Sequence, residues 1–255
     1  MPAPDPSDFF QFCHVYKGFD GHAVLHDVNF DVRRGESVCI MGRSGVGKSV
    51  TLKLIMGFLQ PDQGAIYADG EDVAQLSDAQ LTEMHKKITM VFQSGALFDS
   101  LTVAENVAFP VREREGGSEA EIAATVDRLL GLLDLEGERD AYPGSLSTGM
   151  KRAVAIARAL AAKPQAILYD EPTTMVDPLM SHTIANLILR VKRQVKLTSV
   201  VVTHDTQLAR KLADRLVMLH EGTVRFFGSI AEMDASTDPV VRDFLQQDAL
   251  ADLPA

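Results

Sequence analysis

The chain has 255 residues, a formal net charge of −10 at pH 7 and a pI near 5.1. This length allows one large α/β domain, or one such domain with a smaller inserted lobe. The acidic balance argues against a nucleic-acid partner, and no apolar run reaches the 18 residues of a membrane-spanning helix. Residues 1–6 lack the basic and apolar regions of a secretory signal.

Two cysteines, Cys13 and Cys39, are too few for a disulfide framework. Cys39 lies in an apolar run, so we expect a buried, reduced thiol and a protein of the reducing cytosol.

The first elements that the sequence predicts are strands. From Phe9 to Val32 the apolar residues alternate, with turns at Gly18 and Gly21, which predicts antiparallel strands. After a turn at residues 33–36, a short apolar run at residues 38–41 predicts a buried strand.

A glycine-rich loop follows that strand directly and opens into a helix that we expect to end near Leu59. The residues expected to bind a nucleotide here are Gly42, Arg43, Ser44, Gly45, Val46, Gly47, Lys48, Ser49 and Val50. The glycines let backbone N–H groups point into one concavity, with the positive end of the helix behind a bound anion. Lys48 can reach the β- and γ-phosphates, and the Ser49 hydroxyl can bind Mg²⁺.

The alternative for this loop is a glycine-rich turn that happens to precede a lysine. Strand, loop and helix in this order are the context that a phosphate-binding loop requires, so we favour a nucleotide site.

Two further strands are predicted before the chain becomes helix-rich. Residues 66–68 form a short strand, and residues 88–92 form an apolar strand that stops at Gln93. From about residue 97 to 163 the chain is helix-rich, with a loop at residues 113–117, and we assign this range to an inserted helical lobe. One apolar stripe at helical spacing consists of Ile122, Val126, Leu129, Leu130 and Leu133.

Strands and helices then alternate to residue 204. Residues 166–169 predict a strand that ends in Asp170 and Glu171, and residues 199–203 predict another that ends at His204. An amphipathic helix between them is marked by Ile184, Leu187, Ile188, Val191 and Val195. This alternation implies a mostly parallel sheet with ligand chemistry at the carboxyl ends of its strands.

Polar residues at these strand ends suit a nucleotide phosphate or its metal. Asp170 can hold Mg²⁺ opposite Ser49, and Glu171 can orient or deprotonate the attacking water. His204 can donate a hydrogen bond to the γ-phosphate. The alternatives are a solvated strand end for the carboxylates, a structural role for the histidine, and an ordinary loop glutamine for Gln93.

A second anion-attracting helix start lies in the helical lobe, at Leu146-Ser147-Thr148-Gly149-Met150. Ser147 is placed to cap the helix that follows, and its hydroxyl with the first N–H groups can face a phosphate. From these residues alone, a plain helix cap is the preferred interpretation.

Over residues 9–230 the chain resembles the nucleotide-binding subunit of ABC transporters. The phosphate loop, Gln93, the Leu-Ser-Thr-Gly-Met run, Asp170-Glu171, Asp177 and His204 occur in the order of that family. The resemblance implies an α/β P-loop NTPase fold: a RecA-like mixed sheet, an N-terminal antiparallel β subdomain and an inserted α-helical subdomain. The ATPase domain would span residues 9–237, and residues 238–255 would form a C-terminal tail.

The resemblance also implies a head-to-tail dimer of two copies. Each ATP would lie between the phosphate loop of one copy and Ser147, Thr148 and Gly149 of the other. Gln93 would contact Mg²⁺ and the attacking water, and Asp177 would bridge the two sites. Phe19 lies where the family places an aromatic ring on adenine. Tyr16 is the alternative ring, and core packing is the alternative for both.

Two runs depart from the usual pattern of the family. Thr148 replaces the first glycine of Leu-Ser-Gly-Gly, which brings a Cβ close to the phosphate. Thr174-Met175-Val176-Asp177 replaces Ser-Gly-Leu-Asp. Neither departure removes a polar group assigned to the chemistry, but both leave the turnover rate and the coupling between sites open.

Residues 92–98, followed by residues 103–107, are similar to the branch that serves MCE-type lipid transporters, the Mla system of Gram-negative bacteria and its relatives. This likeness implies a phospholipid transporter with integral membrane permease subunits and an MCE-domain lipid-binding partner. The chain would then be peripheral on the cytoplasmic face of the bacterial inner membrane. Leu97 and Phe98 would lie beside the groove for a permease helix, or belong to the core of the lobe.

Two other functions remain open. One is the ATPase subunit of an importer for amino acids or another small solute. The other is an ABC ATPase without a transporter, although such proteins usually carry two nucleotide units, long insertions or basic surfaces. In the tail, Val240, Val241, Phe244 and Leu245 share one helical face, which we expect to pack on a second copy or on the chain's own sheet.

Overall fold

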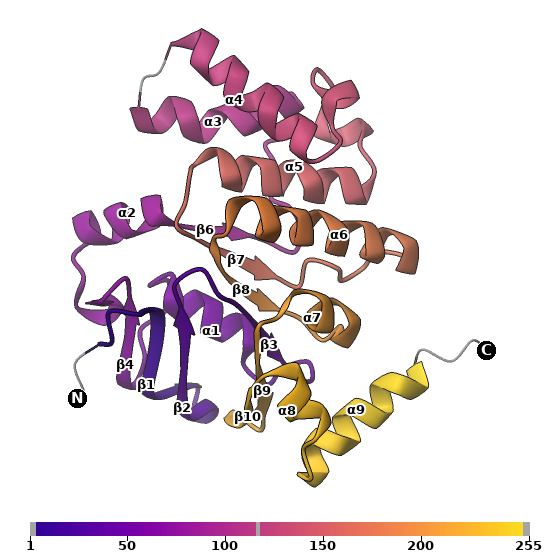
Figure 1. Ribbon diagram of the computed structural model, residues 1–255. Coiled ribbons are helices and arrows are strands. Elements are labelled where there is room, and N and C mark those ends of the chain that lie inside the picture. The colour runs from indigo at the N-terminus through magenta and orange to yellow at the C-terminus, as the bar shows by residue number, and fades with distance from the viewer. Residues whose placement is uncertain (1–3, 116–117, 252–255) are drawn as a thin grey trace.

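The computed structural model describes the backbone of residues 4–115 and 118–251. Its centre is a six-stranded sheet, with a smaller sheet on one side and a helical lobe at the opposite end (Figure 1). The six strands, in spatial order, are β10 (Thr223–Gly228), β9 (Arg215–His220), β3 (Ser37–Met41), β8 (Thr198–Val202), β7 (Ala166–Asp170) and β6 (Ile88–Val91).

Each neighbouring pair of strands in the smaller sheet is antiparallel. The strands lie in the order β2 (His22–Arg33), β1 (Asp8–Phe19), β4 (Gln63–Ala68) and β5 (Glu71–Asp72). In the six-stranded sheet β3 pairs in parallel with both β8 and β9, β7 pairs in parallel with β6 and β8, and only β10 runs antiparallel to its neighbour. The expectation of a mostly parallel sheet beside antiparallel strands is confirmed.

The central strands are buried on both faces. In β3, Cys39 and Met41 belong to the core on the side of the helical lobe, while Val38 and Ile40 belong to the core shared with the antiparallel sheet. Successive side chains of a strand point to opposite faces, so a continuous apolar run serves both cores at once. Burial raises the pKa of the Cys39 thiol to about 12, and the thiol is unpaired, as the sequence predicts.

Helices cover both faces of the sheet and build the lobe (Figure 1). They are α1 (Lys48–Ile55), α2 (Asp78–Lys87), α3 (Val103–Glu115), α4 (Glu119–Leu132), α5 (Thr148–Ala161), α6 (Pro178–Val195), α7 (Thr206–Leu212), α8 (Ile230–Asp234) and α9 (Pro239–Ala251). Single 3-10 turns span Val73–Gln75, Glu136–Glu138 and Pro143–Ser145. Among the described residues, none of these helices has the length and apolar character that crossing a membrane requires.

Several boundaries differ from the sequence-based expectation. Helix α1 ends at Ile55 and not near Leu59, because Gly57 adopts φ +69° and turns the chain. The loop expected at residues 113–117 begins later, since α3 continues through Glu115; residues 116–117 lie outside the described residues. In the predicted stripe of α6, Val195 is 40% exposed, because it is the last residue of the helix and lies beyond the core.

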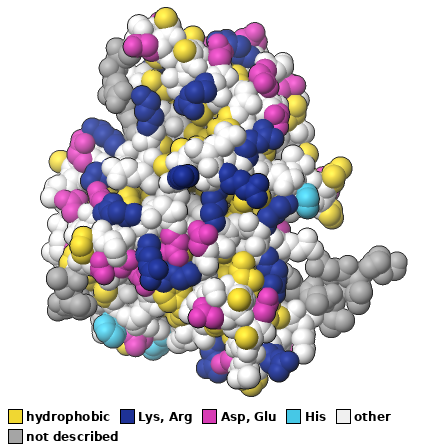
Figure 2. Space-filling model, viewed as in Figure 1, with side chains coloured by type: hydrophobic (Ala, Val, Ile, Leu, Met, Phe, Trp, Pro, Cys, Tyr) yellow, Lys and Arg dark blue, Asp and Glu magenta, His cyan; other side chains and the backbone are white. Residues whose placement is uncertain are grey.

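The predicted stripe of the lobe helix is buried along its whole length, in α4 and the residue after it. Figure 2 shows that Lys and Arg side chains gather across the middle of the visible face, where Figure 1 places α6, with acidic side chains interspersed around them.

The C-terminal helix α9 packs on its own chain. Val241 is fully buried in the core on the lobe side, and Val240, Phe244 and Leu245 pack against that core. Helix α9 contacts β10, so of the two alternatives for the tail the described structure has the packing within one chain.

Replacing Val241 with alanine should therefore lower the free energy of unfolding by about 1–3 kcal/mol, since two buried methyl groups are lost and a cavity remains. Urea denaturation of the purified chain measures this change. The exposed Gln246 on the same helix is the control, and Gln246→Ala should change the free energy of unfolding by less than about 0.5 kcal/mol. Equal effects of both variants would contradict packing of α9 on its own chain.

Candidate nucleotide-binding site

A cavity of about 700 Å³ opens at the carboxyl ends of the parallel strands. Its lining residues are Phe19, Val24, Gly42, Arg43, Ser44, Gly45, Gly47, Lys48, Ser49, Val50, Gln93, Glu171, Thr174, His204 and Phe244. Strand order explains this convergence: β3, β6, β7 and β8 are parallel, so the segments that follow them emerge at the same edge of the sheet.

The loop between β3 and α1 requires glycine at two positions above all. Gly42 has φ +149°, and a Cβ there would lie 2.5 Å from the Leu219 carbonyl oxygen. Gly47, just before α1, has φ +106°, and a Cβ there would lie 2.6 Å from a methyl of Leu25. A side chain at either position would force the backbone out of the curl that turns its N–H groups toward an anion.

The Lys48 side chain crosses the floor of the cavity and is only 6% exposed. Its ammonium donates hydrogen bonds to the carbonyl oxygens of Gly42 (2.8 Å) and Arg43 (3.1 Å), and it lies 3.3 Å from Glu171 Oε1. A buried cation held by neutral carbonyls and one carboxylate is well placed to take phosphate oxygens as further partners.

Glu171 is the most constrained residue of the site. Its backbone has φ +46°, in the left-handed region that costs a non-glycine residue about 1–3 kcal/mol. Its N–H donates to the Val202 carbonyl (2.9 Å), which ties the end of β7 to β8. Its Oε2 accepts from the Thr174 hydroxyl (3.0 Å) and lies 2.9 Å from His204 Nδ1. The strained turn and these partners fix the carboxylate at the wall of the cavity, beside Lys48.

The pairing with Glu171 decides the chemistry of His204. A carboxylate only accepts, so Nδ1 carries a proton in this hydrogen bond. The other ring nitrogen can then donate to a phosphate only when the ring is the imidazolium.

Asp170 and Ser49 form the part of the site that could hold a metal. Ser49 Oγ donates to Asp170 Oδ1 over 2.9 Å, and both oxygens are hard ligands of the kind that Mg²⁺ accepts. Among the described residues, no group of three or more His, Cys, Asp or Glu side chains could hold a metal ion. This donor set fits Mg²⁺, which usually takes one or two carboxylates and completes its shell with phosphate and water.

Burial raises the pKa of Asp170, the Ser49 hydrogen bond lowers it, and the nearby Glu171 charge raises it again. Burial is the largest of these effects, so the pKa of Asp170 in the folded state lies above its ordinary value. The folded state therefore favours the protonated carboxyl, and the stability that this form contributes is lost as pH rises through the raised pKa. Asp170→Asn removes this charge, so the nucleotide-free variant should melt at a higher temperature than the parent at pH 7.5. The difference should shrink as pH falls toward the ordinary carboxyl pKa of about 4.

Thermal unfolding followed by circular dichroism at several pH values measures this effect. Asp140→Asn is the control, because the Asp140 side chain is 91% exposed and gains nothing from neutralisation. A lower melting temperature for Asp170→Asn at pH 7.5 would contradict the burial of an unfavourable charge.

The remaining expected site residues do not line this cavity in the single chain, but Thr148 lines a neighbouring pocket together with Gln93 and Asp170. Ser147 caps α5 by accepting from the Met150 N–H (3.2 Å), and Asp177 caps α6 by accepting from the Met180 N–H (2.9 Å). Ser147 and Thr148 are exposed, while Gly149 is buried with Met180 packed over it. Val46 is partly buried and packs against the core shared with the antiparallel sheet.

Of the two candidate aromatic rings, Phe19 lines the cavity and is 41% exposed. Tyr16 does not line it, and its ring packs edge-on to His26 at 5.7 Å. Three lining residues were not anticipated from the sequence: Val24 from β2, Thr174, and Phe244 from α9. Of these three, only Thr174 could have been predicted from the sequence, because a hydroxyl three residues after Glu171 can reach back to its carboxylate.

A parallel sheet, a glycine loop that leads into a helix, and a buried lysine facing a carboxylate together define a P-loop nucleoside triphosphatase. A profile described as "ABC transporter" matches residues 25–174. The chain therefore belongs to the ABC transporter family, of which it is an ATP-binding ATPase subunit.

Similar proteins support this assignment. The chain is 40% identical over 227 residues to the "Intermembrane phospholipid transport system ATP-binding protein MlaF" of Haemophilus influenzae, which covers 89% of this chain and 86% of that protein. It is 38% identical over 229 residues to the "Probable ribonucleotide transport ATP-binding protein mkl" of Mycobacterium leprae, over 90% of this chain but 66% of that protein. The chain thus spans just under two thirds of the length of that mycobacterial relative.

Among solved structures, the dimeric ATP-binding cassette MJ0796 bound to ADP and Pi is similar, with a TM-score of 0.78 and 34% identity. The match covers 87% of this chain and 98% of that one.

Proposed function

We propose that this chain hydrolyses ATP to power phospholipid transport between membranes, through a separate integral membrane permease and an MCE-domain partner. The observation that carries the proposal is the 40% identity to MlaF, which extends over 86% of a protein named for intermembrane phospholipid transport. Residues 92–98 and 103–107, which resemble the same branch, lie at the junction of the sheet and the helical lobe.

The residues divide into those that bind and those that react. Lys48 and the backbone N–H groups of residues 42–49 hold the phosphates, and Phe19 stacks on the base. Ser49, Asp170 and Gln93 would hold Mg²⁺, which would supply positive charge to offset that of the phosphates. Glu171 takes a proton from the water that attacks the γ-phosphorus, and ADP leaves as the P–O bond breaks.

A second copy of the chain completes each site. Ser147, Thr148 and Gly149 do not line the cavity around Lys48 in their own chain, and the MJ0796 cassette with ADP and Pi is dimeric, which supports a pair of copies; we place these copies head to tail. In that pair the start of α5 faces the phosphates of the other copy, and Asp177 lies between the two sites. We assign residues 9–237 to the ATPase domain, with residues 97–163 as its helical subdomain and residues 238–255 as the tail.

Exposed aromatic residues support a permease contact beside the Gln93 segment. Phe98 is 41% exposed and Phe109 is 40% exposed, and their rings lie 4.8 Å apart, while Leu97 packs against the core of the lobe. We place Phe98 against a permease helix, which puts the chain on the cytoplasmic face of the inner membrane as a peripheral subunit.

The second candidate is an importer for a small solute, and the name of the mycobacterial relative, a probable ribonucleotide transport protein, favours it. One experiment separates the two. The tagged chain is purified from detergent-solubilised membranes, its partners are identified, and the complex is reconstituted in vesicles containing fluorescent phospholipid.

We expect a permease and an MCE-domain protein to co-purify, and phospholipid transfer to acceptor vesicles to require ATP. Co-purification with a permease and a solute-binding protein, with ATP-dependent uptake of a nucleoside or amino acid, would support the importer. Recovery only from the soluble fraction, with ATPase activity but no membrane partner, would reject both.

A further inference from the structure

The end of β1, which carries Phe19, extends beyond one of the two strands that flank it. Pairing with β2 continues to Phe19, whereas pairing with β4 stops at Tyr16, opposite Gln63. Among the described residues, one edge of this strand end therefore lacks a strand partner. A ring that stacks on a nucleotide base has to keep its distance and angle, so this edge needs another support.

Asp62, which directly precedes β4, takes the place of the missing strand partner. Its N–H donates a hydrogen bond to the Tyr16 carbonyl (2.9 Å). Its carboxylate accepts from the Lys17 ammonium at Oδ1 (2.7 Å) and from the Gly18 N–H at Oδ2 (2.7 Å). One side chain thus binds both the main chain and a side chain of the two residues that precede Phe19.

The Lys17 side chain links this carboxylate to the aromatic ring. Residues two apart on a strand point to the same face, so Lys17 and Phe19 lie side by side. The ammonium lies over the Phe19 ring, 5.3 Å from its centroid, and only 14% of the Lys17 side chain is exposed. A cation at this distance is attracted to the face of the ring, which leaves the opposite face for a base. The hydrogen bond from Lys17 lowers the pKa of Asp62, so the carboxylate is charged at neutral pH.

Neither Lys17 nor Asp62 lines the nucleotide cavity, whereas Phe19 does. Their contacts with Gly18 and with the Phe19 ring are therefore the route by which they can act on a bound nucleotide. An effect that passes through this ring should be confined to the part of the nucleotide that the ring touches. Binding of the phosphates by the Lys48 loop should not depend on it.

We propose that Asp62 and Lys17 are positioning residues that hold the Phe19 ring in place for the base of the nucleotide. The inference rests on the proposed function, which assigns Phe19 to the base. Asp62 fixes the end of β1 through Gly18, and it holds the Lys17 ammonium against one face of the ring. The ring is thereby placed before the nucleotide arrives, so binding does not have to order it.

The test compares a ligand that has a base with one that lacks it. Isothermal titration of the full chain with Mg²⁺ gives the Kd for ADP, which is not hydrolysed, and for inorganic pyrophosphate. Phe19→Ala should weaken ADP binding by about tenfold, in line with the loss of one base–aromatic stack. Asp62→Ala and Lys17→Ala should each weaken it by about fivefold. All three variants should bind pyrophosphate within about twofold of the parent.

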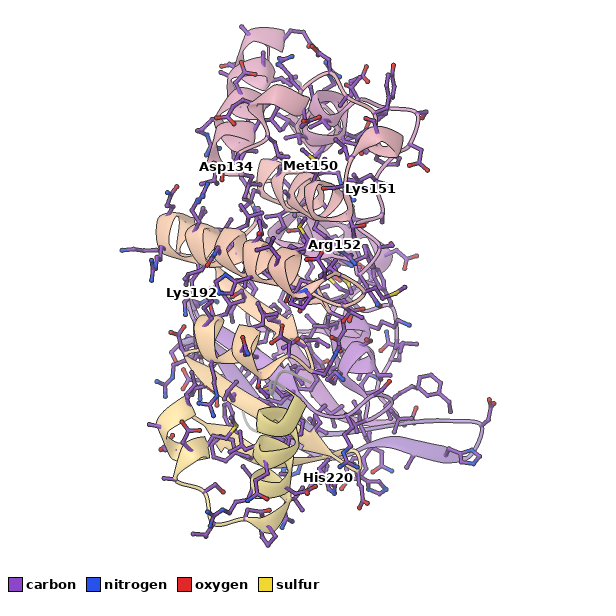
Figure 3. The ribbon with its side chains drawn as sticks, turned by 90° about the vertical axis from the view of Figure 1, so that its right-hand side faces the viewer. Asp134, Met150, Lys151, Arg152, Lys192 and His220 are labelled. Atoms are coloured by element: carbon purple, nitrogen blue, oxygen red, sulfur yellow. The ribbon has the colours of Figure 1, made fainter. Side chains whose placement is uncertain are left out.

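Asp214 provides a matched control, because it makes the same three kinds of contact elsewhere. Its carboxylate accepts from the Lys192 ammonium (2.8 Å) and from the Ser37 N–H (2.9 Å), and its own N–H donates to the Ser37 carbonyl (2.8 Å). Figure 3 shows Lys192 on α6, apart from the smaller sheet, and Asp214 does not line the nucleotide cavity. Asp214→Ala should leave the ratio of the Kd for ADP to the Kd for pyrophosphate within about twofold of the parent.

A double-mutant cycle shows whether Asp62 acts through the ring. In a Phe19→Ala background, Asp62→Ala should change the Kd for ADP by less than about twofold, because the ring that it positions is gone. A further loss of about fivefold in that background would overturn the proposal, since Asp62 would then act by another route.

The remaining outcomes separate this proposal from the proposed function. If Phe19→Ala weakens ADP binding but either Asp62→Ala or Lys17→Ala binds ADP like the parent, the positioning role alone is wrong. Equal losses of ADP and pyrophosphate binding in Asp62→Ala, or the same change of ratio in Asp214→Ala, would also overturn it, because a general loss of structure would explain them. Parent-like ADP binding by Phe19→Ala would reject the assignment of Phe19 to the base, and the positioning role with it.

Discussion

Replacing Glu171 with glutamine is expected to lower kcat for ATP hydrolysis by about 10²- to 10⁴-fold while ATP binding is retained. The amide keeps the size of the side chain and an oxygen for the Thr174 hydroxyl, so the pocket should not collapse. The amide cannot accept a proton from water, however, so ATP is not hydrolysed and the closed site does not reopen. Single-turnover hydrolysis of labelled ATP gives the rate, and equilibrium binding of a fluorescent ATP analogue gives the affinity.

Thr174→Val serves as the control for this variant, because it removes one hydrogen bond to Glu171 and leaves the carboxylate in place. It should lower kcat by about tenfold at most, in line with the loss of one hydrogen bond of about 1 kcal/mol. Turnover by Glu171→Gln within tenfold of the parent would mean that another group accepts the proton.

Replacing Lys48 with alanine is expected to weaken ATP binding by about 30-fold or more and to abolish turnover. The ammonium is buried and faces both the loop carbonyls and Glu171, so its loss removes a phosphate partner and leaves a buried carboxylate unpaired. Truncating one member of such a pair typically costs about 2–5 kcal/mol. Isothermal titration with ATP and Mg²⁺ measures the affinity.

Lys53 offers a matched comparison on the same helix, since it is exposed and lies outside the residues that line the cavity. Lys53→Ala should bind ATP within about twofold of the parent. Equal binding by Lys48→Ala and the parent would place the phosphates elsewhere.

The local part of this site could be predicted from the sequence because its signals are close together in the chain. An apolar strand, the glycines at 42, 45 and 47, and a helix starting at Lys48 specify a phosphate-binding loop within residues 37–55. Apolar strands that stop at Gln93, Asp170 and His204 also indicated which polar groups meet, since parallel strands share one edge.

What the sequence could not provide are contacts between distant segments. Phe244 enters the cavity from α9 only because Val241 is buried in the core, and no local pattern shows which surface accepts that helix. The left-handed backbone of Glu171 also depends on tertiary structure. So do the hydrogen bonds that Arg152 and Arg158 donate to main-chain carbonyls on either side of Gln93. β9 and β10, which complete the large sheet, were not anticipated, because they are six residues each and pair through the order of the sheet.

The central claim is that each ATP is closed between the Lys48 loop of one copy and the Ser147 helix start of the other. Sedimentation velocity of the Glu171→Gln variant tests it most directly, with ATP and Mg²⁺, with ADP and Mg²⁺, and with Ser147→Glu added. We expect dimers only with ATP, and monomers with ADP or when the glutamate at position 147 repels the phosphates. A monomer at saturating ATP, or a dimer that survives both ADP and Ser147→Glu, would contradict the claim.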